Sequence, residues 1–219
     1  MAPEYRLKWI DGSNSRECQE LADLHCRLLP GSPLATLGPR FLARYYYRAL
    51  PALGQVQVLA SRVDGRILGF IAVTADADAF MQTALRTAPL KLAAHLGLAV
   101  LADPRRLLAL REAAAISASR AEVPAGGGEL LSFAVDDSVR NEQFVRSTGI
   151  RIPGELLCHA VERLQEQGVV RIRSLVDADN KSVRILYGAM GWRLESKAPR
   201  GWRRPQVEFV LDTRQLKPA

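Results

Sequence analysis

The stretch "RSTGIRIPGELLCHAVERLQEQG", residues 146–168, joins a glycine-containing turn to a helix and is the first candidate for chemistry. A turn that enters a helix N-terminus presents backbone N–H groups without acceptors, which can bind a phosphate or another anion. Arg146 and Arg151 could add direct charge pairing to phosphate oxygens. Equally, Pro153 could simply start the helix with no ligand near it. The segment therefore predicts either an anion site or a structural helix start.

The cysteines and histidines indicate no metal or disulfide chemistry. The three cysteines are odd in number and have no CxxC spacing, which favours buried free thiols. The three histidines are scattered over separate helical segments, without an HExxH arrangement. These residues are Cys18, Cys26 and Cys158, and His25, His95 and His159. We expect no metal.

Composition limits the class of protein. A chain of 219 residues with 48% hydrophobic content can form one sizeable core, so we expect a single domain over residues 1–219. The net charge of +7 is compatible with nucleic acid, an anionic membrane or a nucleotide cofactor. The basic residues form no run with interleaved aromatic residues, so we expect no specific nucleic-acid partner. The N-terminus has no secretory signal pattern and the longest apolar run is too short to span a bilayer, which favours a cytoplasmic protein.

The order of elements follows from hydrophobic period and turn residues. The pattern predicts strands, helices and one hairpin about the "VDGR" turn, with a long helical stretch before the central strand. The expected strands are 5–10, the two arms of the hairpin within 55–75, 130–135, 169–177, 191–196 and 206–212. The expected helices are about 15–28, 39–50, a helical insert at about 77–120, 153–167 and 180–190.

This order, together with "ELLSFAVDD", the interrupted glycine turn, "LLCHAVERLQEQG" and "VDADNKSVRILYGAMGW", resembles the GNAT superfamily of acetyl-CoA-dependent N-acyltransferases. The resemblance is strongest from Glu129 to Trp192, and the insert resembles extra helices that some members carry. It implies an α/β fold with a mixed, mostly antiparallel central sheet flanked by helices, with an inserted helical pair. It further implies transfer of an acetyl or other acyl group from acyl-CoA to a primary amine by direct attack.

The phosphate turn departs from the pattern of the superfamily. Members usually have Arg or Gln, two residues, Gly, one residue, and Gly or Ala, because a side chain would obstruct the phosphates. Arg151 and Pro153 stand at positions where small residues are usual. A non-catalytic binding protein on the same scaffold is therefore the alternative interpretation.

The resemblance also implies roles for individual residues. Tyr187 matches the tyrosine that protonates the departing thiolate, although it could be an ordinary core residue. Glu129, six residues before Val135, matches the general base of some members, although a solvated carboxylate would be ordinary there. Asp136 and Asp137 are further candidates, but at a strand end they are more typical of caps or turns. The backbone N–H of Val135 or a neighbour could stabilise the negative charge on the thioester oxygen.

Asn180 could contact the pantetheine arm of coenzyme A or cap the following helix. The resemblance implies a small-molecule or peptide amine as acceptor, and we expect the insert to help shape its pocket. The apolar residues of the insert could equally pack on the core, contact a second subunit in a homodimer, or lie at a membrane surface. The residues expected to bind acyl-CoA are Ala134, Val135, Arg146, Thr148, Gly149, Ile150, Arg151, Gly154, Asn180 and Tyr187.

Overall fold

The computed structural model describes residues 3–77, 97, 127–195 and 205–215. The predicted helical insert at about 77–120 lies almost entirely outside these residues. The described part of the chain forms one seven-stranded sheet in the order β1-β2-β3-β4-β5-β7-β6. Its strands are β1 Tyr5–Ile10, β2 Gln57–Val63, β3 Arg66–Thr74, β4 Gly128–Val135, β5 Arg171–Asp177, β6 Arg193–Glu195 and β7 Gln206–Asp212.

Antiparallel pairing dominates the sheet. Only β4 and β5 are parallel neighbours among the described strands, and every other pair is antiparallel. A parallel pair needs a crossover connection, and here the crossover contains α10, Ile152–Glu166. The mixed, mostly antiparallel sheet flanked by helices that the sequence predicts is confirmed.

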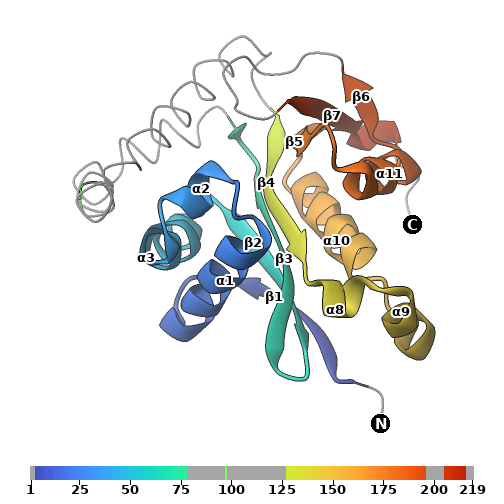
Figure 1. The fold of residues 1–219 in the computed structure, drawn as a ribbon. Helices are drawn as coiled ribbons and strands as arrows, with labels where there is room; N and C mark the ends of the chain where they lie inside the picture. The colour runs from blue at the N-terminus through green and yellow to red at the C-terminus, as the bar shows by residue number, and fades with distance from the viewer. Residues whose placement is uncertain (1–2, 78–96, 98–126, 196–204, 216–219) are drawn as a thin grey trace.

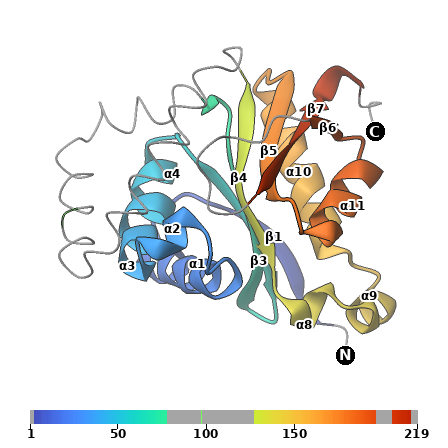
Figure 2. The same cartoon turned by 45° about the horizontal axis from the view of Figure 1, so that its top comes forward.

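Two layers of helices cover the sheet (Figures 1 and 2). On one face lie α1 Ser15–Leu28, α2 Pro33–Thr36, α3 Pro39–Phe41, the π-helix η1 Leu42–Ala49 and α4 Leu50–Ala52. On the other face lie α10 and α11, Lys181–Ala189. Each layer has its own apolar core, and Phe70 of β3 points into the first whereas Ile71 points into the second. The alternation of strand side chains therefore separates the two cores.

Two segments differ from the sequence prediction. The single helix expected over 39–50 is interrupted by the π-helix η1, in which three consecutive tyrosines, Tyr45, Tyr46 and Tyr47, are all buried. An ordinary amphipathic helix buries side chains along only one side. Its hydrophobic period therefore does not predict three consecutive buried residues. The segment between β4 and α10 forms two short helices, α8 Asp137–Arg140 and α9 Glu142–Thr148, which are absent from the helices that the sequence predicts.

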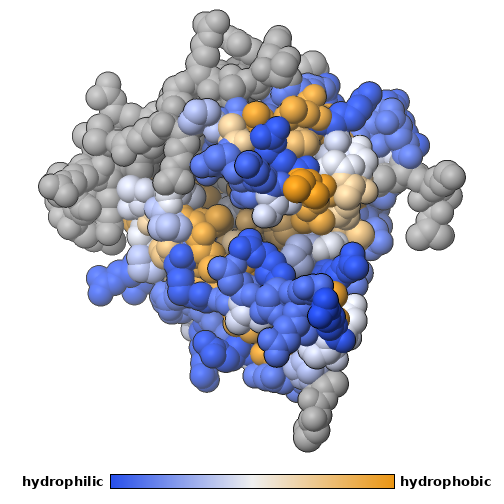
Figure 3. Space-filling view, turned by 45° about the vertical axis from the view of Figure 1, so that its right-hand side comes forward, coloured by the Kyte–Doolittle hydropathy of each residue, from blue (hydrophilic) through white to orange (hydrophobic). Residues whose placement is uncertain are grey.

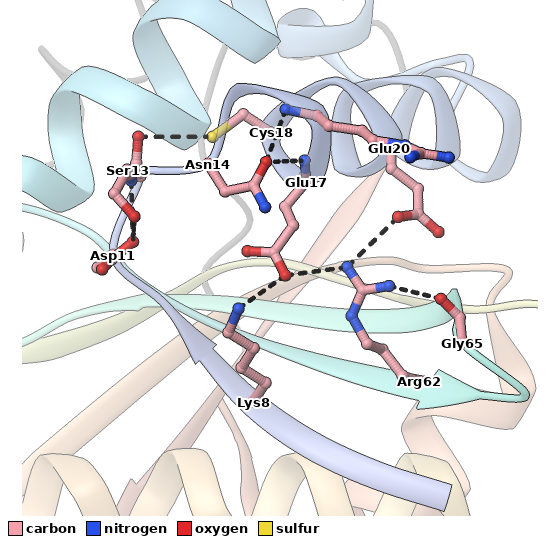
Figure 4. Close-up of polar contacts among 11 residues, drawn as sticks. Lys8, Asp11, Ser13, Asn14, Glu17, Cys18, Glu20, Arg62 and Gly65 are labelled. Carbon is pink, nitrogen blue, oxygen red and sulfur yellow. Dashed lines mark hydrogen bonds and ion pairs between the residues drawn. The ribbon is translucent and has the colours of Figure 1, made fainter. Parts of the chain in front are cut away.

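Charged groups fasten α1 to the sheet (Figure 4). The carboxylate of Glu17, which is buried, accepts hydrogen bonds from Lys8 Nζ at 2.7 Å and from Arg62 Nη2 at 3.1 Å. The neighbouring carboxylate of Glu20 accepts the backbone N–H of Ile67 at 2.6 Å. These bonds connect α1 to β1, β2 and β3. The helix that borders the central strands is thus held in a fixed position.

Candidate functional site

An opening in the sheet separates the outer parts of β4 and β5. The two strands pair over only three residues each, Gly128–Leu130 with Ile172–Ser174. Beyond this point β4 continues to Val135 and β5 continues to Asp177, but no pairing joins them. Parallel neighbours normally share evenly spaced hydrogen bonds along their length. Because this pairing ends early, the backbone groups of β4 that face β5 beyond Leu130 have no strand partner.

The N–H groups of Phe133 and Val135 face this opening. The N–H of Asp136 donates to the carbonyl of Leu68 on the β3 side at 2.8 Å. Because successive N–H groups of a strand point to opposite neighbours, those of Val135 and Phe133 point toward β5 instead. A bulge lies just before them, since Leu130 pairs with Val73 and Ser132 with Ala72, which leaves Leu131 as an extra residue. The strand thus presents two backbone donors toward the gap between β4 and β5.

The N-terminus of α10 lies at the end of the segment that follows β4. Its first N–H groups have no acceptor within the helix, and Arg151 at the N-cap position makes no capping hydrogen bond with its side chain. Pro153 in the first turn removes one donor. A Cβ placed on Gly149 or Gly154 would meet no atom within 4 Å, so the space beside both glycines is open. The arrangement fits an anion, with one donor fewer than a glycine-only turn would provide.

Helix α9 and the residues that follow it, up to Arg151, carry several of the predicted cofactor residues, and most of their polar groups make local contacts. Arg146 pairs with Glu142 at 2.6 Å on the surface of α9. The hydroxyl of Thr148 donates to the carbonyl of Phe144 and accepts the N–H of Ile150. Gly149 ends α9 in the left-handed conformation, with φ of 73°, which favours glycine. Among these residues Arg151 is exposed and has no ion pair within the described part of the chain.

Asp136 connects the end of β4 to the first helical layer. Its carboxylate caps α8 through the N–H of Ser138 at 3.0 Å and pairs with Arg27 of α1 at 2.5 Å. Hydrogen bonds from the hydroxyl and N–H of Ser138, and then the Arg27 guanidinium, lower the pKa of Asp136 to about 2. This carboxylate is an N-cap, as its place at a strand end suggests. Asp137 pairs with Arg140 in the same helix.

Tyr187 is enclosed in the second core. Its side chain is 1% exposed and its ring stacks on Trp192, with ring centres 4.7 Å apart. The hydroxyl lies 3.0 Å from the hydroxyl of Ser174, the last residue of β5 that pairs with β4. Burial raises the pKa of Tyr187, and this effect outweighs the hydrogen bond with Ser174, which acts in the opposite direction. Tyr187 therefore keeps its proton at neutral pH, beside the point where the two strands separate.

Glu129 lies on the face of β4 opposite Tyr187 and is bound to a cation. It is 2% exposed, and its Oε2 accepts the Nε–H of Arg173 at 3.1 Å. Nη2 of Arg173 is also 3.0 Å from the same oxygen. The two residues are cross-strand partners on β4 and β5. A buried carboxylate in such a pair depends on its cation, because removing one partner leaves an uncompensated charge.

Asn180 uses its side-chain oxygen to cap α11. The oxygen accepts the N–H of Val183 at 3.2 Å, which is the second of the two roles that the sequence suggested. The amide nitrogen takes no part in this cap, so Asn180 can still donate a hydrogen bond to a ligand through it.

Sequence reasoning missed the partners of the two predicted catalytic residues. Ser174 and Arg173 stand next to each other on β5 and bind Tyr187 and Glu129 from opposite faces of the sheet. The alternation in "RIRSLVD" carries this information, but only if the strand is known to adjoin β4. Within the described ranges, no group of three or more acidic, histidine or cysteine side chains is arranged to hold a metal. The described helices include none that is both long and apolar enough to cross a membrane.

The face shown in Figure 3 has a recess between two largely hydrophilic regions. Hydrophobic residues gather in this recess, next to hydrophilic surface above and below. A recess with an apolar lining and polar borders is the usual form of a small-molecule site. The fold thus provides both a gap in its sheet and a hollow in its surface.

Comparison with known proteins identifies the fold. No protein-family model matches the sequence, and no curated protein sequence matches it. The solved structures that resemble the chain include aminoglycoside 6'-acetyltransferase type Ii, at a TM-score of 0.57 and 13% identity, with 97% of this chain and 99% of that chain covered. A proposed acetyltransferase from Salmonella typhimurium with its cofactor acetyl-CoA matches at 0.55 and 12%, with 100% and 98% covered. A proposed acetyltransferase of the GNAT family from Desulfovibrio desulfuricans matches at 0.53 and 11%, with 96% and 99% covered. The chain has the GNAT fold.

Proposed function

We propose that the protein is an acyltransferase that moves an acetyl or other acyl group from acyl-CoA to a primary amine. The observation that carries the proposal is the gap between β4 and β5, with the N–H groups of Phe133 and Val135 facing it. A thioester carbonyl placed there would receive a hydrogen bond as negative charge develops on its oxygen. The likeness in fold to acetyltransferases, one of them with acetyl-CoA, supports the same assignment.

The phosphate end of acyl-CoA would lie at the N-terminus of α10. Open space beside Gly149 and Gly154 allows a diphosphate to approach the backbone. The proline removes one donor, and the guanidinium of Arg151 would replace it by charge pairing. Ala134, Val135, Ile150 and the amide nitrogen of Asn180 would line the remainder of the path. In this proposal Arg146 and Thr148 shape α9, because both are engaged within it.

Tyr187 would supply the proton that the departing thiolate needs. In the reaction the amine nitrogen bonds to the acyl carbon, the carbon–sulfur bond breaks, and the sulfur takes the proton of the Tyr187 hydroxyl. The proton that the amine loses leaves to solvent, from which Tyr187 is protonated again. Burial raises the pKa of this phenol, so Tyr187 is protonated at neutral pH and holds the proton to be transferred, although the same shift makes it a weaker acid.

Glu129 has a different role in this proposal from the general base that the sequence suggested. Its carboxylate oxygen is already engaged by Arg173, so taking a proton would weaken a buried ion pair. We propose that Glu129 holds Arg173 in position at the start of the opening. The attacking amine then needs no buried base, provided that its neutral form binds.

Release of free thiol from acetyl-CoA, measured against a set of primary amines, tests the proposal. An acyltransferase releases one thiol for each amine that is acylated, and mass spectrometry of the amine product verifies the transfer. If acetyl-CoA binds but no amine in a broad set is acylated, the non-catalytic binding protein becomes the better account. If acetyl-CoA does not bind, the acyltransferase proposal is wrong, and a non-catalytic protein that binds another ligand or a partner becomes the better account.

A further inference from the structure

A tyrosine–serine pair lies on each face of the sheet beside the opening. On the face toward the second core, the hydroxyls of Tyr187 and Ser174 are 3.0 Å apart. On the face toward the first core, the hydroxyls of Tyr46 in η1 and Ser132 in β4 are 3.3 Å apart. Ser132 follows shortly after Leu130, the last residue of β4 that pairs with β5. In the proposed reaction the first pair supplies a proton, and the second pair has no role.

The bulge in β4 turns Ser132 toward the first core. Leu130 belongs to the second core and Leu131 packs against the first, as the alternation of a strand requires. The next side chain should return to the second core, but Ser132 pairs with Ala72, which is a residue of the first core. Alternation then resumes, since Phe133 packs against the second core. A bulge beside an active site often redirects a side chain in this way.

Tyr46 holds the hydroxyl of Ser132 from the helical layer. Its side chain is buried, and its ring meets the ring of Tyr47 edge to face, with ring centres 5.0 Å apart. Both tyrosines belong to η1, and π-helical turns are frequent at functional sites. A phenol packed among other rings has little freedom to move. Ser132 is therefore oriented by a rigid partner.

Ser132 has hydrogen-bonding capacity that the protein does not use. A hydroxyl donates one hydrogen bond and accepts two, and within the described residues Ser132 makes only the bond with Tyr46. Ser132 is 8% exposed and Tyr46 is 2% exposed, so the serine is the member of the pair that a ligand can contact. The next residue, Phe133, has its N–H directed toward the gap. A serine oxygen with an acceptor site thus lies next to the donor proposed for the thioester oxygen.

We propose that the hydroxyl oxygen of Ser132 binds the attacking amine and that Tyr46 is a positioning residue that orients Ser132. This inference rests on the proposed function. Tyr187 and Trp192 fill the second core beside β5, so the amine would reach the carbonyl carbon from the first-core face. An N–H of the neutral amine donates to Ser132, which directs the nitrogen lone pair toward that carbon. The nitrogen–carbon bond forms and the carbon–sulfur bond breaks. The nitrogen then releases its proton to solvent, and the sulfur takes the proton of Tyr187.

Kinetics with benzylamine, a primary amine with an apolar body, test the two roles. Ser132→Ala should raise the KM for benzylamine by about tenfold or more while kcat changes less than about threefold, because the hydrogen bond is present both before and during attack. Tyr46→Phe should raise the same KM by about threefold to tenfold, since the serine remains but is no longer oriented. Neither variant should change the affinity for acetyl-CoA.

Two control variants separate this effect from a general loosening of the core. Ser61→Ala changes a buried serine of β2 that lies against Leu156 and Val135 of the second core. Tyr45→Phe removes the hydroxyl of the neighbouring buried tyrosine in η1. Both controls should leave the KM for benzylamine within about twofold of its original value. A rise in KM in the controls as large as that in Ser132→Ala would overturn the inference.

Titration of benzylamine into the protein saturated with CoA, followed by NMR, measures amine binding without turnover because CoA carries no acyl group. Binding that Ser132→Ala weakens about tenfold supports the inference even if no acyl transfer is found. Thiol release that continues in Ser132→Ala with an unchanged KM for benzylamine would overturn the inference and leave the acyltransferase proposal intact. Absence of benzylamine binding to the unchanged protein with CoA would overturn it as well.

Discussion

The hydroxyl of Tyr187 lies 3.0 Å from the hydroxyl of Ser174, inside the protein, and Ser174 is the last residue of β5 that pairs with β4. This contact fixes the phenol at the start of the opening. Both groups can donate, so Ser174 can orient the Tyr187 hydroxyl without removing its proton.

Tyr187→Phe should lower kcat by about 10²-fold to 10⁴-fold, the range for loss of a general acid, while acetyl-CoA affinity stays nearly unchanged. The lost hydrogen bond should cost about 1 kcal/mol of unfolding free energy. Steady-state kinetics and thermal unfolding measure the two effects. Tyr5→Phe, which removes the buried hydroxyl of a partly buried side chain on β1, is the control and should leave kcat unchanged. Unchanged turnover in Tyr187→Phe would remove this residue from the mechanism.

Glu129→Gln distinguishes an ion-pair role from a base role. If Glu129 positions Arg173, the substitution leaves a buried guanidinium without its carboxylate and should destabilise the fold by about 3–5 kcal/mol. At a temperature where the variant is folded, kcat should fall less than tenfold. Denaturant unfolding measures the loss of stability and steady-state kinetics measures the loss of kcat, and the two results together distinguish the ion-pair role from the base role. A stable variant with kcat reduced a hundredfold at every pH would restore Glu129 as the base.

Arg151→Ala tests the phosphate end of the site. Loss of a charge-assisted contact should weaken acetyl-CoA binding by about tenfold or more, which corresponds to about 1.4 kcal/mol. The affinity of the unchanged protein should fall as salt concentration rises, and that of the variant should fall less. Arg163→Ala, at the other end of α10, is the matched control. Equal affinities in the two variants would place the diphosphate elsewhere.

Acid should destabilise the protein through Asp136. Its pKa is lowered to about 2 from the ordinary value of 3.8, so the folded state favours the ionised form. The stabilisation is complete above about pH 4 and is lost as the pH falls toward 2. Asp136→Asn keeps a capping side chain but loses the ion pair with Arg27, and should remove about 1–2 kcal/mol of this pH dependence. Unfolding curves at several pH values measure this pH dependence. If the unfolding free energy changed with pH in the same way in both proteins, the assignment of this effect to Asp136 would be contradicted.

Glu208→Gln should raise the melting temperature at neutral pH. Burial raises the pKa of the Glu208 carboxyl, so the folded state favours its protonated form. Ionisation of this carboxyl therefore costs stability as the pH rises through that pKa. Glutamine cannot ionise and avoids this cost. A lower melting temperature at neutral pH would show that Glu208 is compensated in the folded protein.

The sequence predicts the parts of the fold that depend on local rules. The turn at Asp64 and Gly65 has positive φ at both residues, as an Asp-Gly hairpin needs, and Asn14 caps α1 as its position before the helix suggests. The strands and most helices follow from hydrophobic period. The π-helix η1 and the helices α8 and α9 escape the same rules, since the first buries three consecutive tyrosines and the others are one or two turns long.

The candidate site is harder to predict because its contacts join distant segments. Tyr187 and Asn180 are recognisable in the motif around α11, but nothing near them in sequence identifies Ser174 as a partner of Tyr187. Likewise, Ser132 is one small polar residue in an apolar strand until the register and the bulge place it beside Tyr46. Such relationships depend on the order of strands in the sheet, which a single sequence does not specify.

The central claim is that the gap between β4 and β5 binds acyl-CoA, and calorimetric titration with acetyl-CoA tests it most directly. We expect saturable binding of one molecule per chain, and at about 100 times the dissociation constant a gain of roughly 2.7 kcal/mol in unfolding free energy. The affinity should weaken in Arg151→Ala and persist in Tyr187→Phe. No heat of binding and no stabilisation at millimolar acetyl-CoA would contradict the account.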